Sequence, residues 1–171
     1  MISFHPIVCL ESYNVNADEN YIRSCVTTMA ANYLNIKYQW GGLSPEQGLD
    51  CSGLVYEVLT SLGFRFPTVS SSGQLRRSQY LYEVLKAYKR GQIIRPGDLL
   101  WFGKSVNEIT HVSIAISSIL MIEAGGEGRE STDKGSVRIR PIRSDLVAFR
   151  SPVEHLVDSI KKREVNYANV K

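Results

Sequence analysis

The stretch that decides the fold runs from residue 49 to residue 56 and reads Leu49-Asp50-Cys51-Ser52-Gly53-Leu54-Val55-Tyr56. Asp50 is a favourable N-cap residue because its carboxylate can accept a hydrogen bond from a free N–H of the first helical turn. Apolar residues then recur at the spacing of one helix face until Gly63, which supplies a C-terminal stop. The sequence therefore predicts a helix of about a dozen residues with Cys51 in its first turn.

The place of Cys51 at the start of a helix has a chemical consequence. The positive end of the helix dipole favours an anion, and a thiolate is an anion. The thiolate is also the nucleophilic form of cysteine. The alternative interpretation is a structural cysteine, since free cysteines are among the most buried residues.

Length and composition exclude several classes of protein. The chain of 171 residues is long enough for one domain that buries a core without disulfides or metals. A net charge of +3 is too weak and too scattered to indicate nucleic-acid binding. The three cysteines, Cys9, Cys25 and Cys51, form no CxxC pair and indicate neither a disulfide framework nor a zinc cluster. No apolar run has the length of a membrane span, and residues 1–20 lack the features of a secretory signal.

Predicted helices come first along the chain and predicted strands come later. An amphipathic pattern predicts a helix over residues 18–34, and a turn-rich loop at residues 38–48 leads into the Cys51 helix. Short apolar or alternating runs predict strands at residues 99–102, 110–116, 119–123 and 136–142. This order favours an α+β domain in which N-terminal helices pack on a C-terminal antiparallel sheet. We expect the domain to span residues 18–150, between an N-terminal extension at 1–17 and a C-terminal helix with a basic tail at 151–171.

A nucleophilic Cys51 needs a base within hydrogen-bond reach, and the chain has only three histidines. His111 opens an apolar strand, where it can face the start of a helix packed on the sheet. If the strands at 110–116 and 119–123 form a hairpin, position 111 pairs with position 123 or close to it. Glu123 could then orient His111 and stabilise its imidazolium, as the third member of a catalytic triad does. The alternative for His111 alone is a histidine satisfied within the core.

Several motifs in a fixed order carry a resemblance to a known family. They are Tyr38-Gln39-Trp40-Gly41-Gly42, the stretch from Gly48 to Val55, Arg95-Pro96-Gly97-Asp98-Leu99, and His111-Val112-Ser113-Ile114. Over roughly residues 20–143 the chain resembles the NlpC-type cysteine peptidases of bacterial cell walls. The resemblance implies a papain-like fold and cleavage of peptide bonds in the stem peptides of peptidoglycan. The segment Met121-Ile122-Glu123-Ala124-Gly125-Gly126 is similar to one in phage-related members.

The resemblance also implies roles for individual residues. Cys51 is similar to the family's nucleophile and His111 to its general base. The third position, usually a histidine in the family, is Glu123 here, and a carboxylate still orients a histidine and favours its charged form. The resemblance implies that the Tyr38 hydroxyl and the Cys51 backbone N–H are the oxyanion donors. The neighbours Asp50, Ser52 and Trp40 are expected to bind substrate or shape the site, with no metal and no other cofactor.

Two alternatives to hydrolysis share this expected fold. One is a phage-tail or cell-wall module that binds peptidoglycan without cutting it, and the other is an acyltransferase that uses the same thioester with an amine acceptor. A zinc site made of Cys51, His111 and Glu123 would have no recognised ligand spacing. The expected partner is the peptidoglycan stem peptide. Because family members usually act outside the cytoplasmic membrane, the lack of a recognisable signal suggests delivery to the cell wall or periplasm by a phage particle, a lysis system or a secretion machine.

Overall fold

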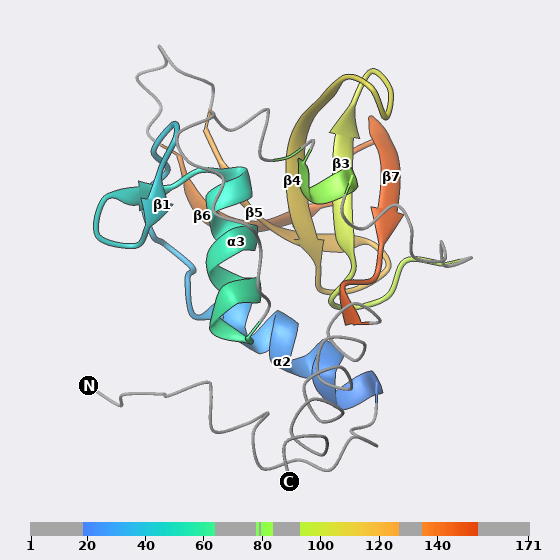
Figure 1. The fold of residues 1–171 in the computed structure, drawn as a ribbon, viewed down its shortest axis with the longest axis horizontal. Coiled ribbons are helices and arrows are strands. Elements are labelled where there is room, and N and C mark those ends of the chain that lie inside the picture. The colour runs from blue at the N-terminus through green and yellow to red at the C-terminus, as the bar shows by residue number, and fades with distance from the viewer. Residues whose placement is uncertain (1–18, 64–77, 79, 84–92, 127–134, 154–171) are drawn as a thin grey trace, which may run out of the picture.

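A computed structural model describes residues 19–63, 78, 80–83, 93–126 and 135–153. Within these residues the chain forms two main helices, a two-stranded ribbon and a five-stranded sheet (Figure 1). The predicted extension at 1–17 and nearly all of the predicted helix and tail at 151–171 lie outside the described residues.

Helix α3, Cys51–Ser61, begins and ends where the sequence predicts. Asp50 is its N-cap, with an extended backbone and a side chain that accepts a hydrogen bond from the Gly53 N–H. At the other end Leu62 is the C-cap, and Gly63 has a φ of +87°, a left-handed conformation that glycine adopts without strain. The local signals of the chain thus fix both ends of the helix that carries Cys51.

The sheet contains five antiparallel strands in the order β6-β5-β4-β3-β7. The strands are β3 (Leu99–Gly103), β4 (Ile109–Ala115), β5 (Leu120–Gly125), β6 (Ser136–Pro141) and β7 (Leu146–Arg150). Four of them were predicted and β7 was not. Strand β7 is short and shows no regular alternation of buried and exposed residues, so its sequence carries little strand signal.

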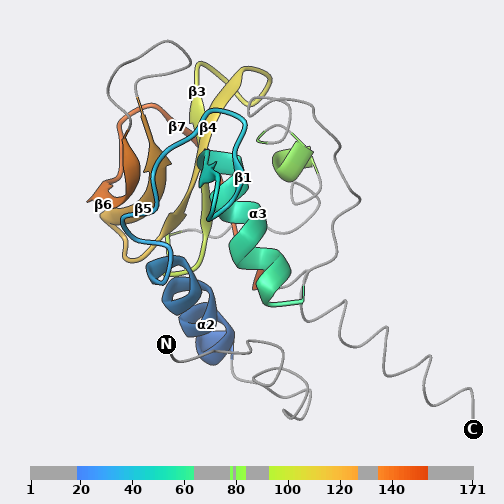
Figure 2. The same ribbon diagram turned by 90° about the vertical axis from the view of Figure 1, so that its left-hand side faces the viewer.

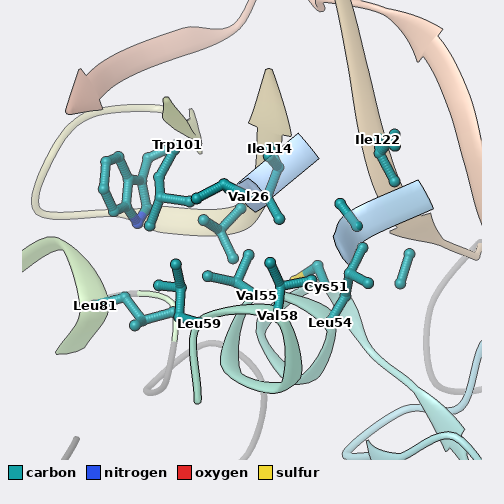
Figure 3. Packing of buried hydrophobic residues seen from close by; sticks show 14 of the residues in the cluster. Val26, Cys51, Leu54, Val55, Val58, Leu59, Leu81, Trp101, Ile114 and Ile122 are labelled. Carbon is teal, nitrogen blue, oxygen red and sulfur yellow. The ribbon is translucent and has the colours of Figure 1, made fainter. Parts of the chain in front are cut away.

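Helix α3 lies against the sheet and contacts β4 and β5, while helix α2, Glu19–Ala31, lies at one end of the sheet (Figures 1 and 2). Side chains from both helices and from the strands form one continuous apolar core. Figure 3 shows its centre, where Val55 and Val58 of α3 approach Trp101 and Ile114 of the sheet. These four side chains are fully buried, and Cys51 belongs to the same cluster. The start of α3 is therefore held on the sheet by packing of its own helix.

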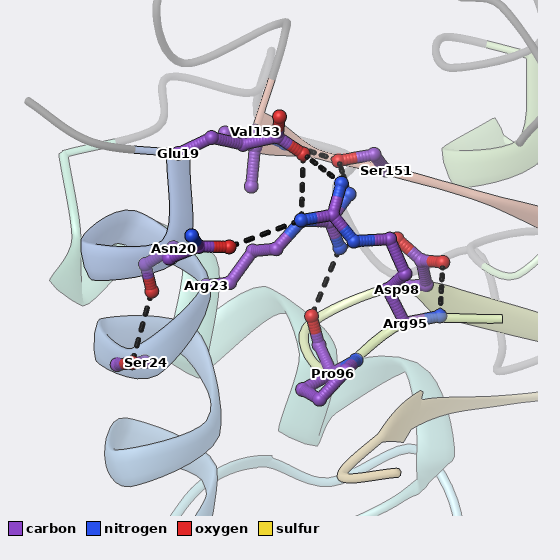
Figure 4. A network of polar contacts seen from close by, with 9 residues as sticks. All are labelled: Glu19, Asn20, Arg23, Ser24, Arg95, Pro96, Asp98, Ser151 and Val153. Atoms are coloured by element: carbon purple, nitrogen blue, oxygen red, sulfur yellow. Dashed lines mark hydrogen bonds and ion pairs between the residues drawn. The ribbon is translucent and has the colours of Figure 1, made fainter. Parts of the chain in front are cut away.

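A buried ion pair fixes α2 to the rest of the domain (Figure 4). The Arg23 guanidinium donates to the Asp98 carboxylate at 2.6 Å and to the Pro96 carbonyl at 2.9 Å. It also donates to the Ser151 hydroxyl at 3.0 Å. One α2 side chain thus connects the turn before β3 with the segment after β7.

The loop before α3 contains a small ribbon of two antiparallel strands, β1 (Leu43–Ser44) and β2 (Gly48–Leu49). Two backbone hydrogen bonds join the loop to itself ahead of the helix, from Asp50 N–H to the Gly42 carbonyl and from Gln39 N–H to the Leu49 carbonyl. The residues predicted as a turn-rich loop thus form an ordered support for Cys51.

Candidate active site

The start of α3 is built around the Asp50 carboxylate. One of its oxygens accepts hydrogen bonds from the Ser52 hydroxyl and from the Gly53 N–H, both at 2.7 Å. A β-carbon added at Gly53 would lie 2.1 Å from the Gly42 carbonyl oxygen, so only glycine lets the loop approach the helix this closely. This packing fixes the direction in which Cys51 leaves the backbone.

The side chains of Asp50 and Ser52 are fully buried and bonded to one another. Asp50 caps the helix and Ser52 donates to the capping carboxylate, so both residues have the structural role that was one of the two expected for them. Their expected contact with substrate stays a prediction.

His111 and Glu123 come together as the sequence predicted, although through a different strand register. His111 Nε2 lies 2.9 Å from a Glu123 carboxylate oxygen, and both side chains are buried. The β4–β5 ladder pairs Ile114 with Ile122, and at this register Ser113, not His111, is opposite Glu123. The Ile116 N–H bonds to the Leu120 carbonyl, so the turn takes three residues where two were expected. His111 and Glu123 are consequently diagonal neighbours, which long side chains can still bridge.

The surroundings of His111 favour its charged form. Burial lowers the pKa of His111, but the charge of Cys51, a hydrogen bond with Cys51 and the Glu123 carboxylate together raise it to about 9. Because Nε2 faces Glu123, Nδ1 is the ring nitrogen left for the thiol. The pKa of Glu123 is in turn lowered: burial opposes this shift, but the His111 hydrogen bond and nearby arginines outweigh it. Such an arrangement supports a thiolate–imidazolium pair next to an ionised carboxylate.

Two arginines of the strand predicted at residues 136–142, which the sequence analysis does not single out, stand beside Glu123. Arg138 is directly opposite Glu123 in the β5–β6 ladder, and its Nε lies 3.5 Å from the carboxylate. Arg140 Nε lies 4.0 Å from the same oxygen. The alternation of residues 137–140 gave the strand but not its register, and only the register brings these charges to the site.

A cavity of about 280 Å³ opens beside the His111–Glu123 pair. Its lining includes Tyr38, Arg138, Arg140 and Arg143. The Tyr38 ring packs closely on Gly126, where an added β-carbon would lie 2.5 Å from the ring. Tyr38 thus lines the same cavity as His111, and its expected role as an oxyanion donor stays a prediction.

Trp40 takes a different place from Tyr38. It is partly buried against the main core and is not among the residues that line this cavity. Its visible contact is therefore the anchoring of the loop before α3, and its expected role at the substrate stays a prediction.

Ser78 is a further residue at the thiol that sequence reasoning missed. Its hydroxyl lies 3.7 Å from Cys51 Sγ, and its carbonyl accepts a hydrogen bond from the Trp101 indole at 3.1 Å. Cys51 has no solvent-exposed surface in this arrangement. The position of Ser78 in a stretch rich in serine and arginine gave no signal of this contact.

Within the described residues, the acidic, cysteine and histidine side chains form no group of three or more that could hold a metal ion. No helix within the described ranges is long and apolar enough to cross a membrane.

Comparison with known proteins agrees with the resemblance carried by the motifs. The model of the NlpC/P60 family matches residues 35–151. Two curated relatives from Bacillus subtilis (strain 168) are each 31% identical to this chain: the bifunctional muramidase/DL-endopeptidase CwlT over 106 residues, and a gamma-DL-glutamyl hydrolase over 101 residues. The matches cover 61% and 58% of this chain but only 30% and 22% of those proteins, so the chain spans less than a third of each relative.

The fold has a close counterpart among solved structures. The P60 domain of an antigen from M. avium subspecies paratuberculosis superposes with a TM-score of 0.59 at 22% identity, covering 78% of this chain and 95% of that domain. The papain-like α+β fold is therefore confirmed. Since the family model covers more than half of the chain and includes Cys51, His111 and Glu123, the chain belongs to the NlpC/P60 family.

Proposed function

We propose that the protein is a cysteine peptidase that hydrolyses amide bonds in peptidoglycan stem peptides through a thioester on Cys51. One observation carries this proposal: buried His111 lies 2.9 Å from the Glu123 carboxylate through Nε2, and the Cys51 thiol at the start of α3 contributes to the raised pKa of the same imidazole. A nucleophile, a base and an orienting group in this order are the signature of nucleophilic catalysis.

In the proposed first step the Cys51 thiolate attacks the carbonyl carbon of the scissile amide. The oxyanion is stabilised by the Tyr38 hydroxyl and by the Cys51 backbone N–H at the start of α3. The tetrahedral intermediate collapses, the carbon–nitrogen bond breaks, and the His111 imidazolium gives its proton to the leaving amine. A thioester on Cys51 and a neutral His111 remain.

In the second step His111 takes a proton from water as the water oxygen bonds to the thioester carbon. The carbon–sulfur bond then breaks, which releases the carboxylic acid and restores the thiolate–imidazolium pair. Glu123 keeps the imidazole in the orientation that both proton transfers need. No step requires a metal ion.

The names of the curated relatives support a more specific bond. One relative is named for DL-endopeptidase activity and the other for hydrolysis of gamma-DL-glutamyl links. We therefore place the scissile bond between a D- and an L-residue of the stem peptide. The predicted delivery by a phage particle or secretion machine and the predicted action in the cell wall or periplasm stay predictions.

The test is digestion of purified peptidoglycan sacculi, with mass spectrometry of the released fragments. We expect the wild-type protein to release truncated stem peptides with a new free carboxyl group, and Cys51→Ala to release none. Cys25→Ala is the matched control, because Cys25 is a second thiol, placed on α2 and not among the residues that line the cavity. Fragments joined to an added amine would favour the acyltransferase, and sacculi bound but left intact would favour the binding module.

A further inference from the structure

Positive charge collects on one wall of the cavity beside His111. Arg138, Arg140 and Arg143 all line it, and His111 itself adds a positive charge below about pH 9. The acidic groups nearby are Glu123, which is shared with His111, and Asp145, which pairs with Arg143. The wall therefore carries a surplus of cations over the anions that the described residues supply.

Arg143 makes close hydrogen bonds to a partner, whereas within the described residues Arg138 and Arg140 make only long ion pairs. The Arg143 guanidinium makes two hydrogen bonds to Asp145. Arg138 and Arg140 have only long ion pairs with Glu123, at 3.5 and 4.0 Å. Among the described residues Arg138 Nε is buried with no hydrogen-bond partner. Guanidinium groups offer five donors each, so most of the donors on this wall remain available to a ligand.

The two arginines are also accessible. Their side chains are 35% and 52% exposed, although Glu123 between them is only 5% exposed. Residues 138 and 140 are two apart on strand β6, and side chains two apart point to the same face of a sheet. The two arginines are therefore neighbours on one face of β6. A ligand in the cavity can thus contact both guanidinium groups while Glu123 stays with His111.

We propose that Arg138 and Arg140 form a subsite for a free carboxylate of the substrate, on an acidic residue next to the scissile bond. The inference rests on the proposed peptidase function and adds the charge of its substrate. Arginine matches a carboxylate with two parallel N–H···O bonds, which gives orientation as well as affinity. The cavity joins this wall to His111 and Tyr38, so a residue held there lies beside the general base.

The arginines have a second effect that an experiment must separate from the first. Both lower the pKa of Glu123, so their removal also weakens the group that orients His111. This loss changes the rate for every substrate by the same factor. The ratio of kcat/KM values for two substrates is unaffected by such a common factor. That ratio therefore reports the subsite alone.

The probe is a pair of stem-peptide fragments that differ at one group: the residue next to the scissile bond carries either a free carboxylate or a primary amide. We expect wild-type protein to show a kcat/KM for the acid at least about tenfold above that for the amide, the size of a charge-assisted contact. Arg140→Gln should reduce this ratio several-fold, Arg140→Lys should restore part of it, and the double variant Arg138→Gln/Arg140→Gln should bring it near one.

Lys104→Gln is the matched control, because it removes the same charge from a side chain that is 88% exposed and is not among the residues lining the cavity. It should leave the ratio unchanged. The Arg140 side chain is 52% exposed, so Arg140→Gln should keep the fold even if the double variant does not.

Two outcomes would overturn the subsite: a wild-type ratio near one, or a high ratio that both arginine variants retain. The Cys51→Ala variant separates this failure from a failure of the peptidase proposal. In calorimetry it should bind the acid peptide at least several-fold more tightly than the amide, and Arg140→Gln in that background should remove the difference. Tighter binding of the acid peptide, without cleavage by wild-type protein, would contradict the peptidase proposal and support the subsite. Equal binding of the two peptides would contradict the subsite.

Discussion

His111 sits between Glu123 and Cys51, and this explains why a glutamate can stand at the third position of the site. His111 Nε2 lies 2.9 Å from the Glu123 carboxylate, and Cys51 also interacts with the imidazole. Burial alone would favour neutral imidazole, but the two partners raise the pKa of His111 to about 9. Arg138 and Arg140 in turn keep Glu123 ionised. The charges at this site therefore run cation, anion, cation, from the two arginines through Glu123 to His111.

The pH dependence of activity should report this order. A raised pKa means that His111 keeps its proton up to about pH 9, so kcat/KM should fall as the pH rises through that value. Glu123→Gln removes the hydrogen bond to an anion and its charge, so the descending limb should move toward neutral pH. We expect kcat/KM at pH 8 to fall by about tenfold or more.

Glu108→Gln is the control for this change, because Glu108 is an exposed acid paired only loosely with Lys104. It should leave the pH profile in place. An alkaline limb that stays at the wild-type pH in Glu123→Gln would show that Glu123 does not set the charge of His111.

The position of Tyr38 depends on a glycine across the cavity. A methyl group at Gly126 would lie 2.5 Å from the Tyr38 ring, so Gly126→Ala must displace the ring. If the Tyr38 hydroxyl stabilises the oxyanion, kcat should fall by about tenfold or more, in the direction of Tyr38→Phe. Steady-state kinetics of both variants, with thermal melting to check the fold, would measure this. Full activity in both would remove Tyr38 from the oxyanion site.

At the scale of elements, Arg23 attaches α2 to the rest of the domain through polar contacts. Its ion pair with Asp98 is buried on both sides, and the same guanidinium bonds to Pro96 and Ser151. Removing one partner of such a pair leaves the other charge buried without compensation.

Arg23→Ala should therefore lower the free energy of unfolding by about 3–5 kcal/mol. Ser24→Ala, at an exposed neighbour on the same helix, should change it by less than about 0.5 kcal/mol. Urea denaturation followed by circular dichroism would measure both. A loss below about 1 kcal/mol for Arg23→Ala would mean that the ion pair contributes no more than a surface pair does.

The elements that the sequence predicts well are those with local signals. Asp50, the apolar spacing of α3 and Gly63 lie within one helix, and each acts through neighbours in the chain. Strand β7 and the β4–β5 register were missed or misplaced for the opposite reason. Tertiary contacts, not local sequence, determine the three-residue turn after Ile116. The same holds for β7, a short strand without alternation of buried and exposed residues.

At the scale of the whole molecule, the order of motifs was sufficient to predict the family, and the expected hairpin brought His111 close to Glu123 although its register differed. The sequence could not predict which other side chains would reach the site. Arg138 reaches the site through the register of β6 on β5. Ser78 is held there by a hydrogen bond from the Trp101 indole of strand β3 to its carbonyl. Both contacts join residues far apart in the chain, and neither has a local pattern.

The central claim is that Cys51 bonds covalently to the acyl part of the substrate, and it can be tested on the protein itself. The measurement is mass spectrometry of protein quenched in acid during turnover of an activated ester of a stem peptide. Such an ester acylates rapidly, so the intermediate should accumulate. Peptide mapping would then locate any added mass.

We expect the mass of the acyl group on the peptide that contains Cys51, released by hydroxylamine as a thioester is, and absent from Cys51→Ala. Continued turnover by Cys51→Ala at the wild-type rate, or an acyl group mapped to another residue, would contradict the account.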